Sequence, residues 1–167
     1  MSGASSPAEP DLFGYRHTQK GPWHFLLHGF AALLLTVGIF NQNEPVAAFV
    51  LPLSGVLMFI LGTSFHHLTV ADEGRQLAIH FGPLPLFRRR IWYDDIREVE
   101  RGRTTFLDGW GIHMSLRGGW VWNIWGYDCV VFRLNQSTLR LGTDDPDNLV
   151  RFVRSRIART SSPPTVT

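Results

Sequence analysis

The sequence predicts a membrane α-helical hairpin followed by a β-rich domain that ends in one helix. Three observations predict it: two long uncharged apolar stretches lie near the start of the chain, short strand-like segments alternate with turns after them, and one amphipathic segment comes last. Charge follows the same division, because all but two of the 16 Lys and Arg residues lie after both apolar stretches.

The two apolar stretches are residues 23–40 and 46–65, and neither contains a formal charge. A helix that rises about 1.5 Å per residue needs about 20 apolar residues to cross a hydrocarbon core of about 30 Å. The connection between them, residues 41–45, is polar and too short for anything but a tight reversal, and Pro45 suits a first helical turn. We therefore expect a transmembrane hairpin at residues 23–65, preceded by a cytoplasmic tail at residues 1–22.

The basic residues predict the orientation of this hairpin. Arg16 and Lys20 precede the first stretch, many Arg residues follow the second, and the connecting loop has none. The positive-inside rule then places both termini in the cytoplasm, as expected for a multi-pass protein of a bacterial inner (cytoplasmic) membrane. A cleavable signal peptide is the competing interpretation of the first stretch, but the second apolar stretch follows it too closely.

Small residues on both stretches predict close packing between helices. This packing can be within the hairpin or against another membrane subunit, and the sequence leaves both open. Pro52 and Gly55 predict a mild kink or a close contact in the second helix. The small residues are Gly29, Ala32, Gly38, Ser54, Gly55 and Gly62.

Four histidines are expected at one depth of the hairpin. His24 and His28 share a face of the first helix, and His66 and His67 finish the second helix. Imidazoles at one level raise the hypothesis of a haem, pigment or metal held by His24 and His28. The alternative is interfacial imidazoles that contact headgroups or backbone carbonyls, and it is favoured because no carboxylate or Cys joins them at ligand spacing. We expect no cofactor.

Residues 66–159 predict a cytoplasmic β domain, and residues 160–167 a disordered tail. Short strand-like segments bounded by Gly, Asp, Asn and Pro are typical of a barrel or sandwich. Pro146 occupies a first helical position, and Leu149, Phe152, Val153 and Ile157 form one apolar stripe after it. The candidate strands are residues 68–70, 77–81, 90–93, 96–100, 111–116, 120–125, 129–134 and 138–142.

Three short motifs in this region resemble the bacterial pleckstrin-homology-like (PH-like) membrane proteins. They are the strand pair that ends at residues 79–83, the segment 91–96 and the segment 141–146 before the final helix. The resemblance implies a half-open barrel capped by the helix, in a family that is mostly non-enzymatic. PH domains that bind phosphoinositides use a basic loop between their first two strands. The matching loop here, residues 72–76, is net acidic, which argues against inositol-lipid recognition.

Two segments are candidate binding sites. Phe87, Arg88, Arg89 and Arg90 combine an apolar side chain with three cations, and each cation near an anionic membrane is worth about 1 kcal/mol. The alternative is a solvated turn whose arginines pair with nearby carboxylates. Four of the six Trp residues lie close together in sequence, either in the core or as an exposed patch for a protein partner. These are Trp110, Trp120, Trp122 and Trp125.

No catalytic motif stands out in the sequence: it has no glycine-rich phosphate loop with Lys and no His-Glu-x-x-His. The single cysteine, Cys129, lies in an apolar run and excludes an internal disulfide. We therefore expect a non-enzymatic accessory module that binds and stabilises other membrane proteins in a complex, with no nucleic acid and no small-molecule substrate. The alternatives are a module that binds anionic lipid headgroups, and a haem- or pigment-associated subunit.

Overall fold

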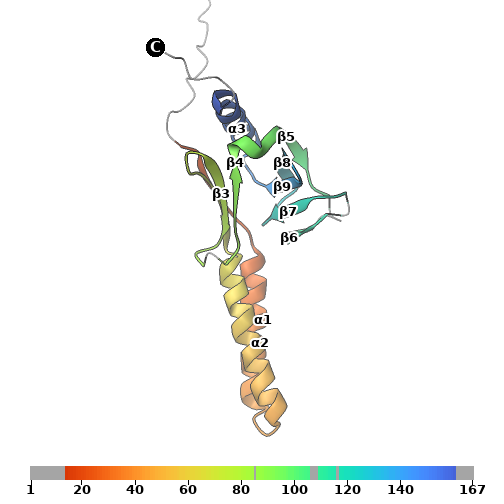
Figure 1. Cartoon of the computed structure of the whole chain (residues 1–167). Coiled ribbons are helices and arrows are strands. Elements are labelled where there is room, and N and C mark those ends of the chain that lie inside the picture. Colours follow the sequence, from red (N-terminus) through yellow and green to blue (C-terminus); the bar gives the residue numbers. More distant parts are fainter. Residues whose placement is uncertain (1–13, 85, 106–108, 116, 161–167) are drawn as a thin grey trace, which may run out of the picture.

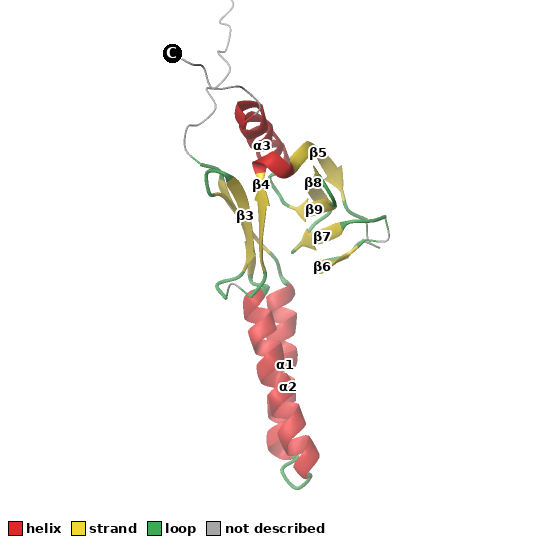
Figure 2. Ribbon diagram, viewed as in Figure 1, coloured by secondary structure: helices red, strands yellow, loops and turns green. Residues whose placement is uncertain are grey.

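The computed structural model describes residues 14–84, 86–105, 109–115 and 117–160 of the 167-residue chain. Two long helices lie side by side and project from a region of β-strands, and the C-terminal helix lies at the opposite end of the molecule (Figure 1). In Figure 2, β3 and β4 lie between the hairpin and the C-terminal helix, and β5 to β9 lie to one side. The sequence correctly predicted this division into an apolar helical hairpin, a β-rich region and one final helix.

The helical hairpin is inserted between two paired strands. Strand β1 (Arg16–Lys20) precedes helix α1 (Trp23–Phe40), and helix α2 (Pro45–Ser64) leads into strand β2 (His67–Asp72). β1 and β2 pair antiparallel. The segment that we expected to be an N-terminal tail therefore contains a strand of the β region, while residues 1–13 lie outside the described part of the chain.

The helix bounds agree with the predicted stretches to within one residue, and Pro45 occupies the first turn of α2. Three of the six small residues, Gly38, Gly55 and Gly62, contact the other helix of the hairpin. A Cβ added at Gly38 would lie 2.7 Å from the Pro52 ring, and one added at Gly55 would lie 3.1 Å from the Ala31 carbonyl oxygen. The predicted close contact at Pro52 and Gly55 is thus a contact with α1. Gly29 differs, since a Cβ there would meet nothing within 4 Å.

The strands form two sheets. Sheet A has the order β1-β2-β3-β4 and is antiparallel throughout, and a short 3-10 turn, η1 (Tyr93–Asp95), leads from it to sheet B. Sheet B has the order β5-β8-β9-β7-β6, in which only β7 and β9 run parallel among the described strands. The remaining bounds are β3 (Gln76–Phe81), β4 (Arg88–Trp92), β5 (Ile96–Arg103), β6 (Gly111–Met114), β7 (Trp120–Asn123), β8 (Asp128–Leu134) and β9 (Thr138–Gly142).

The hydrophobic core lies between the sheets. Ile79 and Phe81 of sheet A and Phe132 and Leu141 of sheet B belong to one fully buried cluster. Helix α3 (Pro146–Thr160) begins at the predicted Pro146 and packs on β5, β8 and η1. Its predicted stripe is buried as expected, with Leu149 and Val153 inaccessible to solvent and Phe152 and Ile157 half-buried against the core. The pairings among the described strands give two separate sheets, and they do not close a barrel.

Candidate functional site

The four histidines predicted at one depth do gather where the helices meet sheet A. The ring of His24 lies 4.6 Å from that of His66 and 6.1 Å from that of His28, measured between centroids, and the rings of His66 and His67 are 5.4 Å apart. Burial lowers the pKa of His66 and of His67 first, and neighbouring imidazoles and Lys20 lower both further. This histidine cluster is therefore a place where additional positive charge is unfavourable.

The two proposed cofactor ligands already contact protein atoms. His24 is buried, and its Nδ1 lies 2.7 Å from the Gly21 carbonyl oxygen. His28 Nε2 lies 3.3 Å from the Thr63 hydroxyl, and its ring stacks on Phe59 at 4.8 Å. Within the described ranges, no three His, Cys, Asp or Glu side chains are placed to hold a metal ion. Both imidazoles thus contact a backbone carbonyl or a side chain of the chain itself.

Aromatic side chains join α1 to sheet B. Trp110 stacks on Trp125 with ring centroids 5.2 Å apart and planes 17° apart, and Trp23 lies 5.4 Å from Trp110. Tyr127 adds a fourth ring, 6.1 Å from Trp110. Trp23 is the first residue of α1, so this aromatic cluster lies at the end of the hairpin. Tryptophan and tyrosine favour the depth of the membrane–water interface.

The predicted Trp patch divides between core and surface. Trp122 is buried and its ring contacts Phe81 at 5.8 Å, so this residue serves the core. Trp120 and Trp125 remain 39% and 42% exposed. β7 ends earlier than predicted because the Asn123 side chain accepts the Trp125 backbone N–H and donates to the Gly126 carbonyl, which turns the chain. The structure thus brings Trp110 and Trp125 together and separates both from Trp122.

The predicted lipid-contact segment is also divided. The Phe87 ring packs on Phe65 at 5.3 Å and belongs to the edge of the core. Arg88 and Arg90 both pair with Glu73, at 2.9 and 3.4 Å. The side chain of Arg89 points to the other face of β4, and burial lowers its pKa. The exposed apolar residues lie just before this segment, where Leu84 and Leu86 are 40% and 58% exposed.

A cationic trough runs along the face of sheet A that points away from the core. It is a cavity of about 420 Å³ whose floor includes the small residues Ala71 and Ala78. Burial, followed by the charges of Arg88 and Arg16, lowers the pKa of His80 inside it. The lining residues are Arg16, His67, Ala71, Asp72, Glu73, Ala78, His80, Gly82, Pro83 and Arg88.

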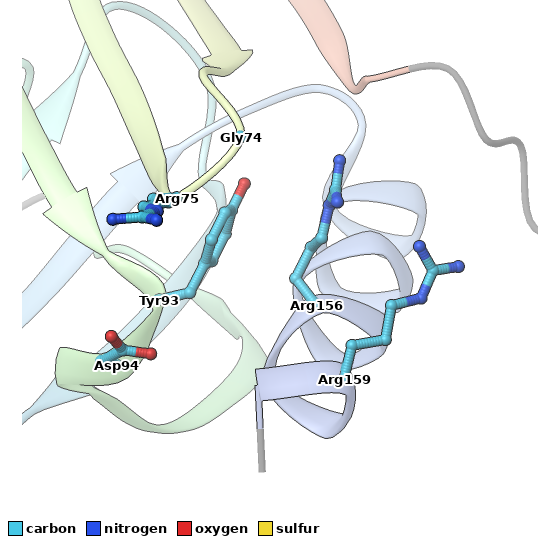
Figure 3. A pocket seen from close by; sticks show the side chains of 6 residues that line it. All are labelled: Gly74, Arg75, Tyr93, Asp94, Arg156 and Arg159. Atoms are coloured by element: carbon cyan, nitrogen blue, oxygen red, sulfur yellow. The ribbon is translucent and has the colours of Figure 1, made fainter. Parts of the chain in front are cut away.

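A second cavity, of about 340 Å³, lies at the end of the β region that is far from α1 and α2. It is bounded by the β2–β3 turn, η1 and α3. Figure 3 shows Arg156 and Arg159 extending from α3 on one side, with Arg75 and Tyr93 on the other. The Tyr93 hydroxyl donates to Asp72 at 2.7 Å, and Arg156 pairs with the same carboxylate. Burial and this hydrogen bond raise the pKa of Tyr93, so the phenol stays protonated and remains a hydrogen-bond donor to Asp72. The arrangement ties sheet A to α3.

No protein-family model matches the chain, and no curated protein is similar enough to be matched to it. The sequence did not reveal two features of the site. The cationic trough combines Arg16 with Arg88, which come from opposite edges of sheet A and are distant in sequence. The aromatic cluster also contains Trp23, which we had expected to be part of the hairpin only. Neither the trough nor the aromatic cluster can be predicted without knowing that β1 pairs with β2.

Proposed function

We propose that the chain is a non-enzymatic, membrane-anchored PH-like module that binds and stabilises other membrane proteins as an accessory subunit. In this proposal α1 and α2 cross a bacterial inner membrane, and both termini and the β region lie in the cytoplasm. The two helices are long and apolar enough to span a membrane, and large apolar side chains along them are exposed. Two sheets followed by a C-terminal helix support the PH-like assignment.

The observation that carries the proposal is the insertion of the hairpin between β1 and β2. A domain attached through a single flexible linker would sample many orientations above a membrane. Here both ends of the hairpin continue directly into paired strands, and Trp23 packs on Trp110, which directly precedes β6 of the other sheet. The β region is therefore held in one orientation relative to the helices, which is what a module needs to present a fixed surface to a partner in the same membrane.

The partner surface that we propose lies on β6 and β7. Met114 and Trp120 are cross-strand neighbours and remain 66% and 39% exposed. β6 is an edge strand of sheet B and lies on the side from which the helices project (Figure 1). Trp and Met are enriched in protein interfaces, and neighbouring exposed apolar residues mark interaction sites on otherwise polar surfaces. A membrane protein beside the hairpin would meet this edge.

Affinity purification of the full chain in mild detergent tests the proposal. We expect a stoichiometric integral membrane protein, identified by mass spectrometry, to co-purify with the wild-type chain. The double substitution Met114→Gln, Trp120→Gln should abolish this co-purification. Trp92→Gln is the matched control, because Trp92 is 51% exposed on β4 of the other sheet. A wild-type chain that purifies alone, or a partner retained by the double variant, contradicts the proposal.

A second candidate function, a module that binds anionic lipid headgroups, is favoured by the cationic trough. The trough differs from the predicted segment, because it includes only Arg88 of that segment and adds residues of β1, β2 and β3.

A further inference from the structure

We propose that the cationic trough on sheet A is a binding site for the phosphate of an anionic glycerophospholipid, with Arg16 and Arg88 as the principal phosphate ligands. This proposal rests on the proposed membrane anchorage, but it is independent of the proposed protein partner, which would bind the other sheet. It assigns a ligand to a surface that the accessory function does not use.

The register of sheet A places Arg16, Lys20, Arg88 and Arg90 on one face, while Arg89 lies on the other. Arg16 aligns with Ala71, Ala78 and Arg90 across the four strands. The next row on the same face aligns Thr18, Thr69, His80 and Arg88. The third row, closest to the helices, pairs Lys20 with His67. The small side chains of Ala71 and Ala78 in the first row leave room between Arg16 at one edge of the sheet and Arg88 of the next row at the other edge.

Positive charge exceeds negative charge on this face. Asp72 lines the trough, but its carboxylate is engaged by Tyr93 and Arg156. Glu73 is the remaining carboxylate among the lining residues that the structure describes. In the same described part of the chain, no carboxylate forms an ion pair with Arg16 or with Lys20. An anion entering the trough would therefore find Arg16 unneutralised, with Lys20 nearby on the same face of β1, while Arg88 is shared with Glu73.

The Glu73 carboxylate shows that this surface can hold an oxyanion. It accepts hydrogen bonds from Arg88 at 2.9 Å and from Gln76 at 2.7 Å, and it pairs with Arg90 at 3.4 Å. These contacts, the Gln76 hydrogen bond first, hold the pKa of Glu73 below its usual value. A lipid phosphate has the same preference for arginine forks as a carboxylate. Glu73 thus acts as an internal competitor that the phosphate must displace from Arg88.

The position of the trough selects a lipid as the source of the phosphate. Gly82 lines the trough and lies directly against the end of α2, because a Cβ there would be 2.3 Å from the Ser64 carbonyl oxygen. Leu84 and Leu86 follow at once and are exposed. The trough therefore opens beside the end of the hairpin and beside apolar side chains suited to the bilayer interface. A soluble phosphate would gain nothing from these leucines.

Native mass spectrometry and intrinsic-fluorescence titration of the detergent-solubilised full chain test the assignment. The probe is dioctanoyl phosphatidic acid, with dioctanoyl phosphatidylcholine and inorganic phosphate as comparison ligands. We expect phosphatidic acid to bind more tightly than either. Arg16→Gln and Arg88→Gln should each weaken its binding about fivefold, because one cation near an anionic headgroup is worth about 1 kcal/mol. Glu73→Gln should tighten it, since the internal competitor loses its charge.

Arg133→Gln is the matched control, because it removes the same charge from sheet B, where Arg133 pairs with Glu98 and Glu100. It should leave the affinity unchanged. The proposal is overturned if phosphatidylcholine binds as tightly as phosphatidic acid, if Arg133→Gln weakens binding as much as Arg88→Gln, or if Glu73→Gln weakens binding. Inorganic phosphate binding as tightly as the lipid overturns the lipid assignment. None of these outcomes depends on whether a protein partner co-purifies.

Discussion

Thr18 and Thr69 face each other across sheet A with their hydroxyl oxygens 2.9 Å apart, although both apolar helices lie between them in sequence. This pairing closes the hairpin at its base. Both ends of the hairpin are therefore attached to neighbouring strands of sheet A. The short connections reinforce this, since Gly21 and Pro22 are the only residues between β1 and α1.

Deletion of residues 2–20 is expected to destabilise the chain much more than deletion of residues 2–13. The longer deletion removes β1 and the hydrogen bond from the buried Gln19 to the Trp125 carbonyl, while the shorter one leaves both intact. We expect the longer deletion to lower the midpoint of thermal unfolding in detergent by at least about 5 °C relative to the shorter one. Equal midpoints would show that β1 does not stabilise the connection between the helical hairpin and the β region.

Substitution of Gly82 should be more harmful than substitution of Gly74. Both residues have positive φ, +57° and +83°, so alanine strains the backbone at either position by about 1–2 kcal/mol. At Gly82 the added Cβ would also clash with the Ser64 carbonyl, whereas at Gly74 nothing lies within 4 Å. Chemical unfolding should show a larger loss for Gly82→Ala than for Gly74→Ala. Similar losses would mean that the loop is not pressed against α2.

Asp72→Asn should weaken the attachment of α3. The Asp72 side chain is 3% exposed and accepts hydrogen bonds from Tyr93 and Arg156, and loss of a charged hydrogen bond of this kind costs about 1.5–3 kcal/mol. Asp147→Asn is the control, because Asp147 forms an exposed pair with Arg101, worth about 0–1 kcal/mol. Chemical unfolding of both variants gives the change in the free energy of unfolding that each substitution causes. A loss no larger for Asp72→Asn than for Asp147→Asn contradicts this role.

The sequence predicted the elements whose signals are local. Uncharged length marked α1 and α2, and Pro146 with the following apolar stripe marked α3. Strand β1 was missed because its five residues lack an apolar alternation and its partner follows the whole hairpin. Arg88 to Arg90 were treated as one basic patch, yet successive residues of a strand point to opposite faces, so the structure separates Arg89 from its neighbours. The trough needs four strands in register, which no single segment encodes.

The histidines near the connection between the hairpin and sheet A make the folding stability depend on pH. The pKa values of His66, His67 and His80 are all lowered, with burial as the largest cause in each case. The unfolded chain then binds more protons than the folded chain as pH falls through about 6.5. Stability is therefore fully present above that pH and is lost below it. The charged or titratable neighbours of His66 are His24, His28 and Lys20. Those of His67 are His66, His80 and Lys20. Those of His80 are Arg16, Arg88 and Glu73.

The thermal midpoint of the full chain in detergent should accordingly fall between pH 7.5 and pH 5.5, a window (about 2 pH units) in which ordinary carboxylates do not titrate. The double substitution His67→Gln, His80→Gln should flatten this dependence. An anion in the trough should oppose it, because a phosphate beside protonated His67 and His80 would offset the repulsion from Arg16, Arg88 and Lys20. We therefore expect dioctanoyl phosphatidic acid to raise the thermal midpoint more at pH 5.5 than at pH 7.5. An equal rise at both pH values would show that His67 and His80 do not interact with the bound lipid phosphate.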